Sequence, residues 1–252
     1  MVAEALSYLP GTPQLLLAVA AILIGGCLRG FVGFGGALTI IPVLALIFTP
    51  KEAVAMHIIM EIPGTLQLLP AAVRQSDRRA VLPTLIAIAV GMPIGVYLLT
   101  VLDPQPMRIA ISLLVLAMVG LLAKNWRYPG VIGSPVMAGV GLIGGLAQGS
   151  TGMGGPPVVA VLMSRPDDNT TLRGNVLATM AGLVIVAIPM QGAFGILTMK
   201  AITLGLLAGP FYVLATYLGS RYYRLGGNRF YRVSALCFLA AVATASLIAS
   251  LR

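Results

Sequence analysis

Two ionisable side chains, His57 and Glu61, lie four residues apart in an otherwise apolar stretch of the chain. That spacing places both on one face of a helix. An ionisable group inside an apolar segment is costly and therefore usually functional. Burial disfavours the charged form of a carboxylate, so we expect Glu61 to hold a proton and to exchange it with His57. The pattern predicts a proton-coupling pair; a structural ion pair of Glu61 with His57 or Arg29 is the alternative.

Two glycine-rich runs, residues 25–36 and 144–155, suggest a second kind of chemistry. Each glycine costs a helix about 1 kcal/mol relative to alanine, so both runs are expected to break their helices. In lipid, an unwound backbone is tolerated only where it is buried in protein or lines a wet cavity. The N–H groups that begin the helix after a break attract anions. Two such breaks meeting near the middle of a bilayer would bind an anion; close helix packing through small residues is the alternative.

The elements that must position these residues are membrane-spanning helices. Of the 252 residues, 58% are hydrophobic and 9% are charged, whereas a soluble domain carries about 25% charged residues. The apolar segments expected to lie in the bilayer are residues 12–30, 32–48, 52–73, 80–102, 106–123, 134–149, 153–164, 171–191, 199–219 and 230–250. The seventh is short and bounded by glycine and proline, which predicts a half-helix or part of a re-entrant pair.

The chain also repeats itself. Residues 25–36 align with residues 144–155 at a shift of 119, and six glycines coincide. Each run lies between the first and second segments of a five-segment half. We therefore divide the chain into a first transmembrane repeat, residues 1–130, and a second, residues 131–252, which together form one integral membrane unit.

Basic residues indicate the orientation of these segments. Eleven of the sixteen lysines and arginines lie in one alternating set of connections, and four lie in the opposite set and the tail. The positive-inside rule places the first set in the cytoplasm and both termini outside. An odd number of segments per half then inverts one half relative to the other, which is typical of secondary transporters. The expected fold is all-α and polytopic, in a bacterial-type inner (plasma) membrane, with broken or re-entrant helices at the glycine-rich motifs.

The two motifs, Gly30-Phe31-Val32-Gly33-Phe34-Gly35-Gly36 and Gly149-Ser150-Thr151-Gly152-Met153-Gly154-Gly155-Pro156, resemble those of a known family. This is the TauE/SafE sulfite exporter family, also called the 4-toluenesulfonate uptake permease family. The resemblance covers the whole chain. It implies transport of sulfite, an organosulfonate or a related sulfur oxyanion, coupled to protons. The second copy has Pro156-Pro157 where the first has Ala37-Leu38, so the two half-sites are not equivalent.

The residues expected to bind the substrate lie in and beside the motifs. Arg29 could give charge-assisted hydrogen bonds to sulfonate oxygens, with extension to the membrane surface as the alternative. Its positional counterpart is Gln148, a neutral donor of similar reach. Several aromatic residues, Tyr212 among them, could line a pocket for an aromatic sulfonate, with packing as the alternative. The full predicted set is Arg29, Gly33, Phe34, Gly35, Gly36, Gln148, Ser150, Thr151, Gly152, Gly154, Gly155 and Asn175.

Other function classes fit the composition less well. A channel would share the pore chemistry without alternating access. An enzyme needs a positioned nucleophile or metal, and one histidine with two cysteines in apolar segments makes a poor catalytic or metal site. No cofactor and no nucleic-acid partner are expected, because the basic residues lie in short connections between apolar segments. The expected partners are a small anion, the lipid bilayer and protons; a homo-oligomer and a monomer are both open.

Overall fold

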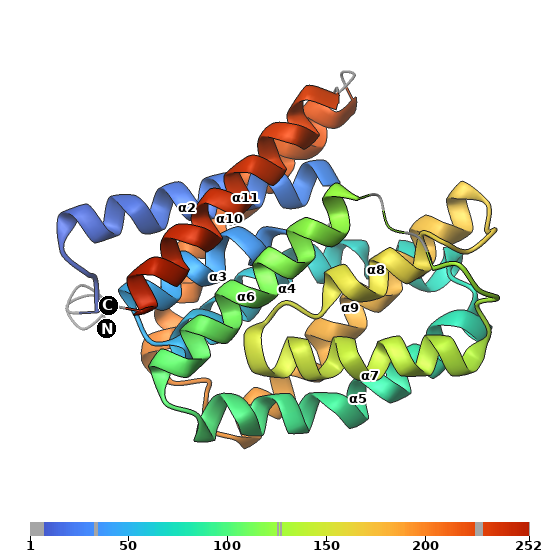
Figure 1. Ribbon diagram of the computed structural model, residues 1–252, viewed down its shortest axis with the longest axis horizontal. Helices are drawn as coiled ribbons and strands as arrows, with labels where there is room; N and C mark the ends of the chain where they lie inside the picture. Colours follow the sequence, from blue (N-terminus) through green and yellow to red (C-terminus); the bar gives the residue numbers. More distant parts are fainter. Residues whose placement is uncertain (1–7, 33–34, 125, 127, 225–228, 252) are drawn as a thin grey trace. The chain divides into compact units, whose positions relative to one another are not determined.

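The computed structural model describes residues 8–32, 35–124, 126, 128–224 and 229–251, and the regular elements in these ranges are helices (Figure 1). In chain order they are α2 Thr12–Val32, α3 Gly36–Ile47, α4 Pro50–Gln75, α5 Arg78–Val101, α6 Pro104–Ala123, α7 Ser134–Thr151, α8 Gly155–Leu162, α9 Asn169–Ala193, α10 Met199–Arg224 and α11 Arg229–Leu251. The predicted all-α fold is confirmed, and the helices follow the predicted apolar segments to within a few residues.

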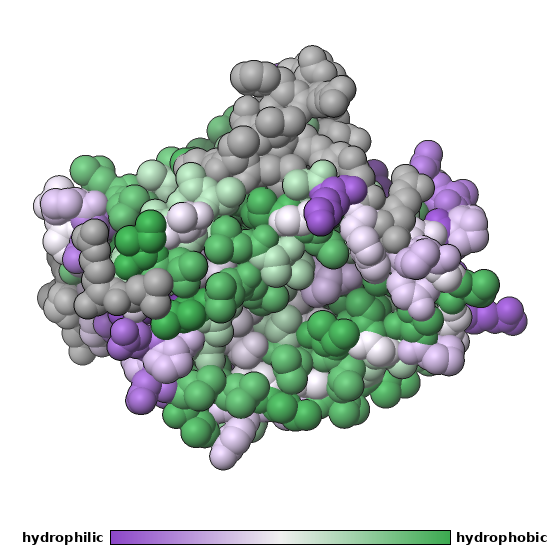
Figure 2. Space-filling model, viewed as in Figure 1, coloured by the Kyte–Doolittle hydropathy of each residue, from purple (hydrophilic) through white to green (hydrophobic). Residues whose placement is uncertain are grey.

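Six of the described helices are long and apolar enough to cross a membrane, namely α2, α4, α5, α6, α9 and α10. Large apolar side chains such as Leu16, Ile86 and Leu206 are exposed on them. Figure 2 shows apolar residues over much of the face that it draws. In water, such a surface would favour aggregation, whereas in lipid it is solvated. The protein is therefore a multi-pass membrane protein.

Two helices are too short to span a bilayer. Helix α3 has 12 residues and α8 has 8, so their lengths are about 18 Å and about 12 Å at 1.5 Å per residue. The hydrocarbon core of a bilayer is about 30 Å thick. The prediction of a short seventh segment agrees with α8. The predicted second segment, residues 32–48, is longer than α3, which begins at Gly36 after its cap residue Gly35.

Helices α2 and α3 form an antiparallel hairpin. A Cβ atom added at Gly25 would lie 2.6 Å from Ile40 Cγ1, and one added at Gly36 would lie 3.2 Å from Arg29 Cβ. The contact between Gly36 and Arg29 lies near the turn, and the contact between Gly25 and Ile40 lies farther from it along both helices, which is the pattern of an antiparallel pair. The C-terminal end of α3 is fixed by α6, because Arg108 donates from Nε to the Ala45 carbonyl at 2.7 Å and from Nη2 to the Phe48 carbonyl at 3.1 Å.

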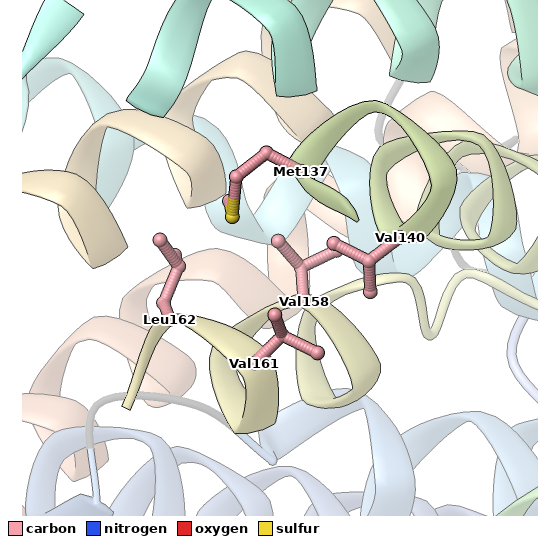
Figure 3. Packing of buried hydrophobic residues seen from close by; sticks show 5 residues of the cluster. All are labelled: Met137, Val140, Val158, Val161 and Leu162. Atoms are coloured by element: carbon pink, nitrogen blue, oxygen red, sulfur yellow. The ribbon is translucent and has the colours of Figure 1, made fainter. Parts of the chain in front are cut away.

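Helices α7 and α8 form a second hairpin of the same kind. Its glycine contact is between Gly144 and Val158, where an added Cβ would lie 2.5 Å from Val158 Cγ2. Farther from the turn, the hairpin is closed by buried apolar side chains from both helices (Figure 3). This cluster consists of Met137, Val140, Val158, Val161 and Leu162.

The helices group by packing into two compact units. Unit 1 contains residues 1–60, 102–123 and 195–252, and unit 2 contains residues 61–101 and 124–194. Each unit holds one hairpin, and α4 passes from the first unit into the second. The units are defined by packing, whereas the predicted repeats are divisions of the sequence, so each unit contains helices from both predicted repeats.

In unit 1, α2 packs along α10 of the other sequence half. The contact is made through glycine. A Cβ added at Gly26 would lie 3.0 Å from the Tyr212 carbonyl oxygen, and one added at Gly30 would meet the Thr216 carbonyl and lie 2.8 Å from Ser220 N. The two backbones are therefore in direct contact, as in small-residue helix pairs of other membrane proteins.

In unit 2, α7 packs along α5 in the same way, and the two helices run side by side in Figure 1. A Cβ added at Gly145 would meet the Ile88 carbonyl. One added at Gly149 would meet the Met92 carbonyl and lie 2.7 Å from Val96 N. Here too, a side chain on either glycine would push the helices apart.

The two glycine contacts correspond residue by residue. Glycines 26 and 30 of α2 match glycines 145 and 149 of α7, each 119 positions later, and their partners in α10 match those in α5, each 124 positions earlier. The corresponding partner pairs are Tyr212 with Ile88, Thr216 with Met92, and Ser220 with Val96. The sequence repeat is therefore accompanied by a repeat of packing in which each half supplies the partner helix of the other.

Candidate functional site

The first break separates α2, which ends at Val32, from α3, which begins at Gly36. Gly35 caps α3 with φ 96°, in the left-handed region that disfavours residues with a Cβ atom. Of the residues predicted here, Gly35 and Gly36 lie at the turn of the hairpin. Gly33 and Phe34 lie outside the described residues.

The second break separates α7, which ends at Thr151, from α8, which begins at Gly155. Gly152 has φ 71° and donates its N–H to the Gln148 carbonyl at 2.9 Å, which closes the last turn of α7. The helix ends at this break, Thr151 and Gly155, lie 119 residues after the helix ends at the first break, Val32 and Gly36. The predicted glycines 152, 154 and 155 all lie at this turn.

Gln148 spans the second break. Its side-chain oxygen Oε1 accepts the backbone N–H of Gly154 at 2.9 Å, and the side chain is buried. Gly154 has no room for a side chain, because an added Cβ would lie 2.7 Å from Gln148 Cβ. The amide of Gln148 therefore satisfies a donor that the break exposes, and its own N–H2 group is the part that can donate to a ligand.

The hydroxyl groups at the end of α7 are bonded within the helix. Ser150 Oγ donates to the Leu146 carbonyl at 2.8 Å, and Thr151 Oγ1 donates to the Ala147 carbonyl at 2.7 Å. Both residues are buried. In this arrangement their oxygen lone pairs are available as acceptors.

Arg29 lies 119 residues before Gln148, so the two residues hold corresponding positions in the sequences of the two hairpins. The Cβ of Arg29 backs against Gly36, and the Cβ of Gln148 backs against Gly154, in each case across the turn. Arg29 is half-buried and lies in the last turn of α2. A cation there offsets the partial negative charge of the helix C-terminus. The sequence positions of Arg29 and Gln148 correspond, but their contacts are offset by one residue, because Gly36 corresponds to Gly155 and Gly154 corresponds to Gly35.

The two short helices differ in the donors that they present at their N-termini. The first N–H groups of a helix have no partner within it. In α3, Gly36 and Ala37 both carry such groups. In α8, Pro156 and Pro157 have no N–H, so Gly155 alone among the first three residues carries one.

His57 and Glu61 are both buried in α4, one turn apart, as predicted. The ring of His57 lies edge-on to the ring of Tyr212 from α10, with a centroid distance of 6.1 Å and an interplanar angle of 74°. Arg29 and Tyr212 thus meet Gly36 from α2 and α10, and His57 of α4 contacts the ring of Tyr212.

Asn175 is not at a break but in a polar network between two loops of unit 2. Its Oδ1 accepts the N–H of Asp77 at 2.7 Å, and its Nδ2 donates to Asp167 Oδ2 at 3.0 Å. Arg165 joins the same carboxylates through Nε to Asp167 Oδ2 at 2.7 Å and Nη2 to Asp77 Oδ2 at 3.1 Å. Both functions of the Asn175 amide are engaged in holding the α4–α5 and α8–α9 loops together.

Two side chains near the first break did not enter the predicted site. Tyr212 is 3% exposed, and its hydroxyl oxygen would lie 3.1 Å from a Cβ at Gly36. Thr39, three residues after Gly36 in α3, is fully buried, and its Oγ1 has no hydrogen-bond partner. The sequence signal for Thr39 is a hydroxyl within an apolar run. Tyr212 was named from the sequence only as an aromatic residue that could line a pocket, and the contact of its hydroxyl depends on how α10 packs.

Among the residues that the structure describes, no three histidine, cysteine, aspartate or glutamate side chains gather where a metal ion could be held. The Ser150 and Thr151 hydroxyls donate within α7, so the donors described at the breaks are backbone N–H groups, one guanidinium and one amide. Such a donor set suits an oxyanion.

The model of the family described as sulfite exporter TauE/SafE matches residues 17–246 of the chain. Neither a curated protein nor a solved structure matches it. The matched range contains both helix breaks, both glycine contacts and the buried pair in α4. The resemblance inferred from the two motifs is thereby confirmed: the chain belongs to the sulfite exporter TauE/SafE family, whose description is that of a membrane transporter of sulfur compounds.

Proposed function

We propose that this protein is a secondary transporter of a sulfur oxyanion, either sulfite or an organosulfonate such as 4-toluenesulfonate, coupled to protons. The observation that carries the proposal is the pair of matching helix breaks in an apolar chain of this family. Breaks at corresponding positions of two sequence halves are typical of secondary transporters. Sulfite and sulfonate groups carry several acceptor oxygens, and the donors at the breaks match them.

In this proposal the two halves have opposite orientation in the membrane, and both termini lie outside. The exchanged pairing, α2 with α10 and α5 with α7, supports a repeat in which each half completes the other. The charge bias of the connections supports the orientation. Labelling of single cysteines introduced at Ser76 and at Thr198, with a reagent that does not cross membranes, tests both. Reaction at residue 198 alone is expected in intact cells, whereas reaction at residue 76 alone would reverse the assignment.

Glu61, with His57 one turn away, is proposed to carry the coupled proton. Both side chains are buried in α4, and an ionisable group inside a membrane-spanning helix is usually functional. Arg29 is proposed to carry the positive charge that the anion requires. Transport moves the substrate without changing it chemically, so the substrate should be recovered unaltered.

Uptake by the purified protein in proteoliposomes tests this function. Labelled sulfite and labelled 4-toluenesulfonate are compared with labelled acetate and with protein-free vesicles. Saturable uptake of a sulfur oxyanion above both controls is expected. Flat traces for both sulfur oxyanions, from protein that retains its thermal unfolding transition, would contradict the proposed substrate class. A rate that rises linearly with concentration, without saturation, would favour the channel alternative.

A further inference from the structure

The first break carries two donors that its counterpart lacks. We propose that the hydroxyl groups of Tyr212 and Thr39 bind the oxyanion together with the N-terminus of α3, so that the protein holds one anion, at the first break. This inference rests on the proposed function and assigns the substrate contacts within it.

Tyr212 reaches the break from α10. Its hydroxyl oxygen would lie 3.1 Å from a Cβ at Gly36, the first residue of α3. Gly36 is buried there, and its missing side chain makes room for the phenol, for Arg29 Cβ and for the Gly25 carbonyl oxygen. The ring is held by its edge-on contact with His57 and by the close α2–α10 packing at Gly26. The phenol thus lies beside Gly36, the first residue of a helix whose first N–H groups have no partner within it.

Thr39 supplies an independent indication of a ligand. Its side chain is fully buried, and its hydroxyl has no hydrogen-bond partner. Leaving such a group unsatisfied costs about 1–3 kcal/mol. In α3 it follows Gly36 by three residues and so lies on nearly the same face. Helical side chains lean toward the N-terminus. The hydroxyl therefore lies over the first turn of α3, on the side where the break begins.

The second break offers no comparable set. The residue corresponding to Tyr212 is Ile88 in α5, and the residue corresponding to Thr39 is Val158 in α8. Gln148 already accepts the N–H of Gly154. Pro156 and Pro157 carry no N–H, and a Cβ at Gly155 would lie 2.9 Å from Met180 Sδ. The side chains of Gln148 and Met180 thus occupy the space around this turn, which is why one anion rather than two is expected.

The donors at the first break match the oxygens of a sulfonate group. The α3 N–H groups and the two hydroxyls donate to its oxygens, and Arg29 supplies the charge. A carboxylate has two oxygens that accept hydrogen bonds and a sulfonate has three. Removing one hydroxyl from the site should therefore raise the Kd of a sulfonate more than the Kd of a carboxylate.

Calorimetric titration of the detergent-solubilised protein with sodium sulfite and with sodium 4-toluenesulfonate tests the inference. Wild type is expected to bind one anion per chain. Tyr212→Phe keeps the ring and its contact with His57, and Thr39→Val keeps the shape of the side chain. Each is expected to raise Kd about tenfold, the effect of losing one hydrogen bond to a charged group.

Two matched substitutions serve as controls. Tyr217→Phe removes a phenol from an exposed position of the same helix. Thr84→Val removes a fully buried threonine hydroxyl that donates to the Ala80 carbonyl at 2.9 Å. Neither is expected to change Kd by more than about twofold. Without anion, Thr39→Val should unfold at or above the wild-type temperature, because its hydroxyl has no partner to lose, whereas Thr84→Val should unfold below it.

The outcomes separate this inference from the proposed function. A wild type that binds and transports a sulfur oxyanion, together with Tyr212→Phe and Thr39→Val variants of unchanged Kd, would overturn the inference and leave the function standing. Two anions per chain would also overturn it. A wild type that binds neither anion would overturn both.

Discussion

The side-chain oxygen of Gln148 accepts the backbone N–H of Gly154 at 2.9 Å, across the turn between α7 and α8. The bond joins residues six positions apart and encloses the left-handed Gly152. A break in a buried helix exposes donors that lipid cannot satisfy. Here one such donor is satisfied by a side chain that the preceding helix supplies, which explains how the chain tolerates a turn at this depth.

Removing that oxygen should therefore destabilise the second hairpin. Gln148→Met keeps the side-chain volume and leaves the Gly154 N–H buried without an acceptor, for an expected loss of about 1–3 kcal/mol. Thermal unfolding in detergent measures it. Gln67→Met, at an exposed position of α4, is the control and should leave the unfolding temperature nearly unchanged. Equal unfolding temperatures for the two variants would mean that the bond does not hold the turn.

The glycine contacts predict a position-dependent response to alanine. A Cβ at Gly149 meets the Met92 carbonyl and lies 2.7 Å from Val96 N. Gly149→Ala should therefore force α5 and α7 apart and cost about 1–3 kcal/mol. Gly139 lies in the same helix with open space around it. Gly139→Ala should be neutral or stabilising by up to about 1 kcal/mol. Unfolding temperatures of the two variants in one detergent check the difference, and a stable Gly149→Ala variant would contradict the packing.

The sequence predicted the helices well, because long apolar runs punctuated by glycine and proline define where each begins and ends. It did not predict their neighbours. Most of these helices are apolar on nearly every face, so the pattern carries no stripe that would show which side meets protein. The pairing of α2 with α10 and of α5 with α7 rests on backbone contacts at a few glycines, visible only once the helices are placed.

The predicted site was recovered unevenly for related reasons. Of the described motif glycines, Gly35, Gly36, Gly152, Gly154 and Gly155 lie at the turns, since their effect on the backbone is local, whereas Gly30 and Gly149 lie within helices at helix contacts. The role of a polar side chain depends on distant partners. Asn175 was grouped with the substrate-binding residues, which would place it at corresponding depth to the residues of the first half that carry the site. The start of α9 at Asn169, 119 residues after Pro50, instead aligns Asn175 with Met56. Its amide is engaged with Asp77 and Asp167.

That network should hold the loops of unit 2 together. Arg165→Met keeps most of the side-chain bulk and removes the ion pairs with Asp77 and Asp167, leaving two carboxylates without their cation. We expect a loss of about 1–3 kcal/mol, because the hydrogen bonds are charge-assisted and the side chains largely buried. Arg173→Met, at an exposed position of α9, is the matched control. Thermal unfolding checks both, and equal effects would show that the network contributes nothing beyond general charge.

Proton coupling can be separated from binding with one substitution. Glu61→Gln keeps the side-chain size and removes the titrating carboxyl group. Uptake driven by a pH gradient should fall to the level seen without the gradient, while binding of the anion persists. Glu52→Gln is the control in the same helix, since glutamine still accepts the Thr49 N–H that Glu52 Oε2 accepts at 3.0 Å. Full gradient-driven uptake by Glu61→Gln would remove Glu61 from the proton pathway.

The central claim, that this chain carries a sulfur oxyanion by alternating access, is tested most directly by counterflow. Proteoliposomes are loaded with a high concentration of unlabelled sulfite or 4-toluenesulfonate and diluted into a trace of the labelled anion. The proposal predicts a transient accumulation of label that depends on the trapped anion and is absent from vesicles loaded with acetate. Label that enters at the same rate whatever anion is trapped would contradict alternating access, and no entry of either sulfur oxyanion would contradict the substrate class.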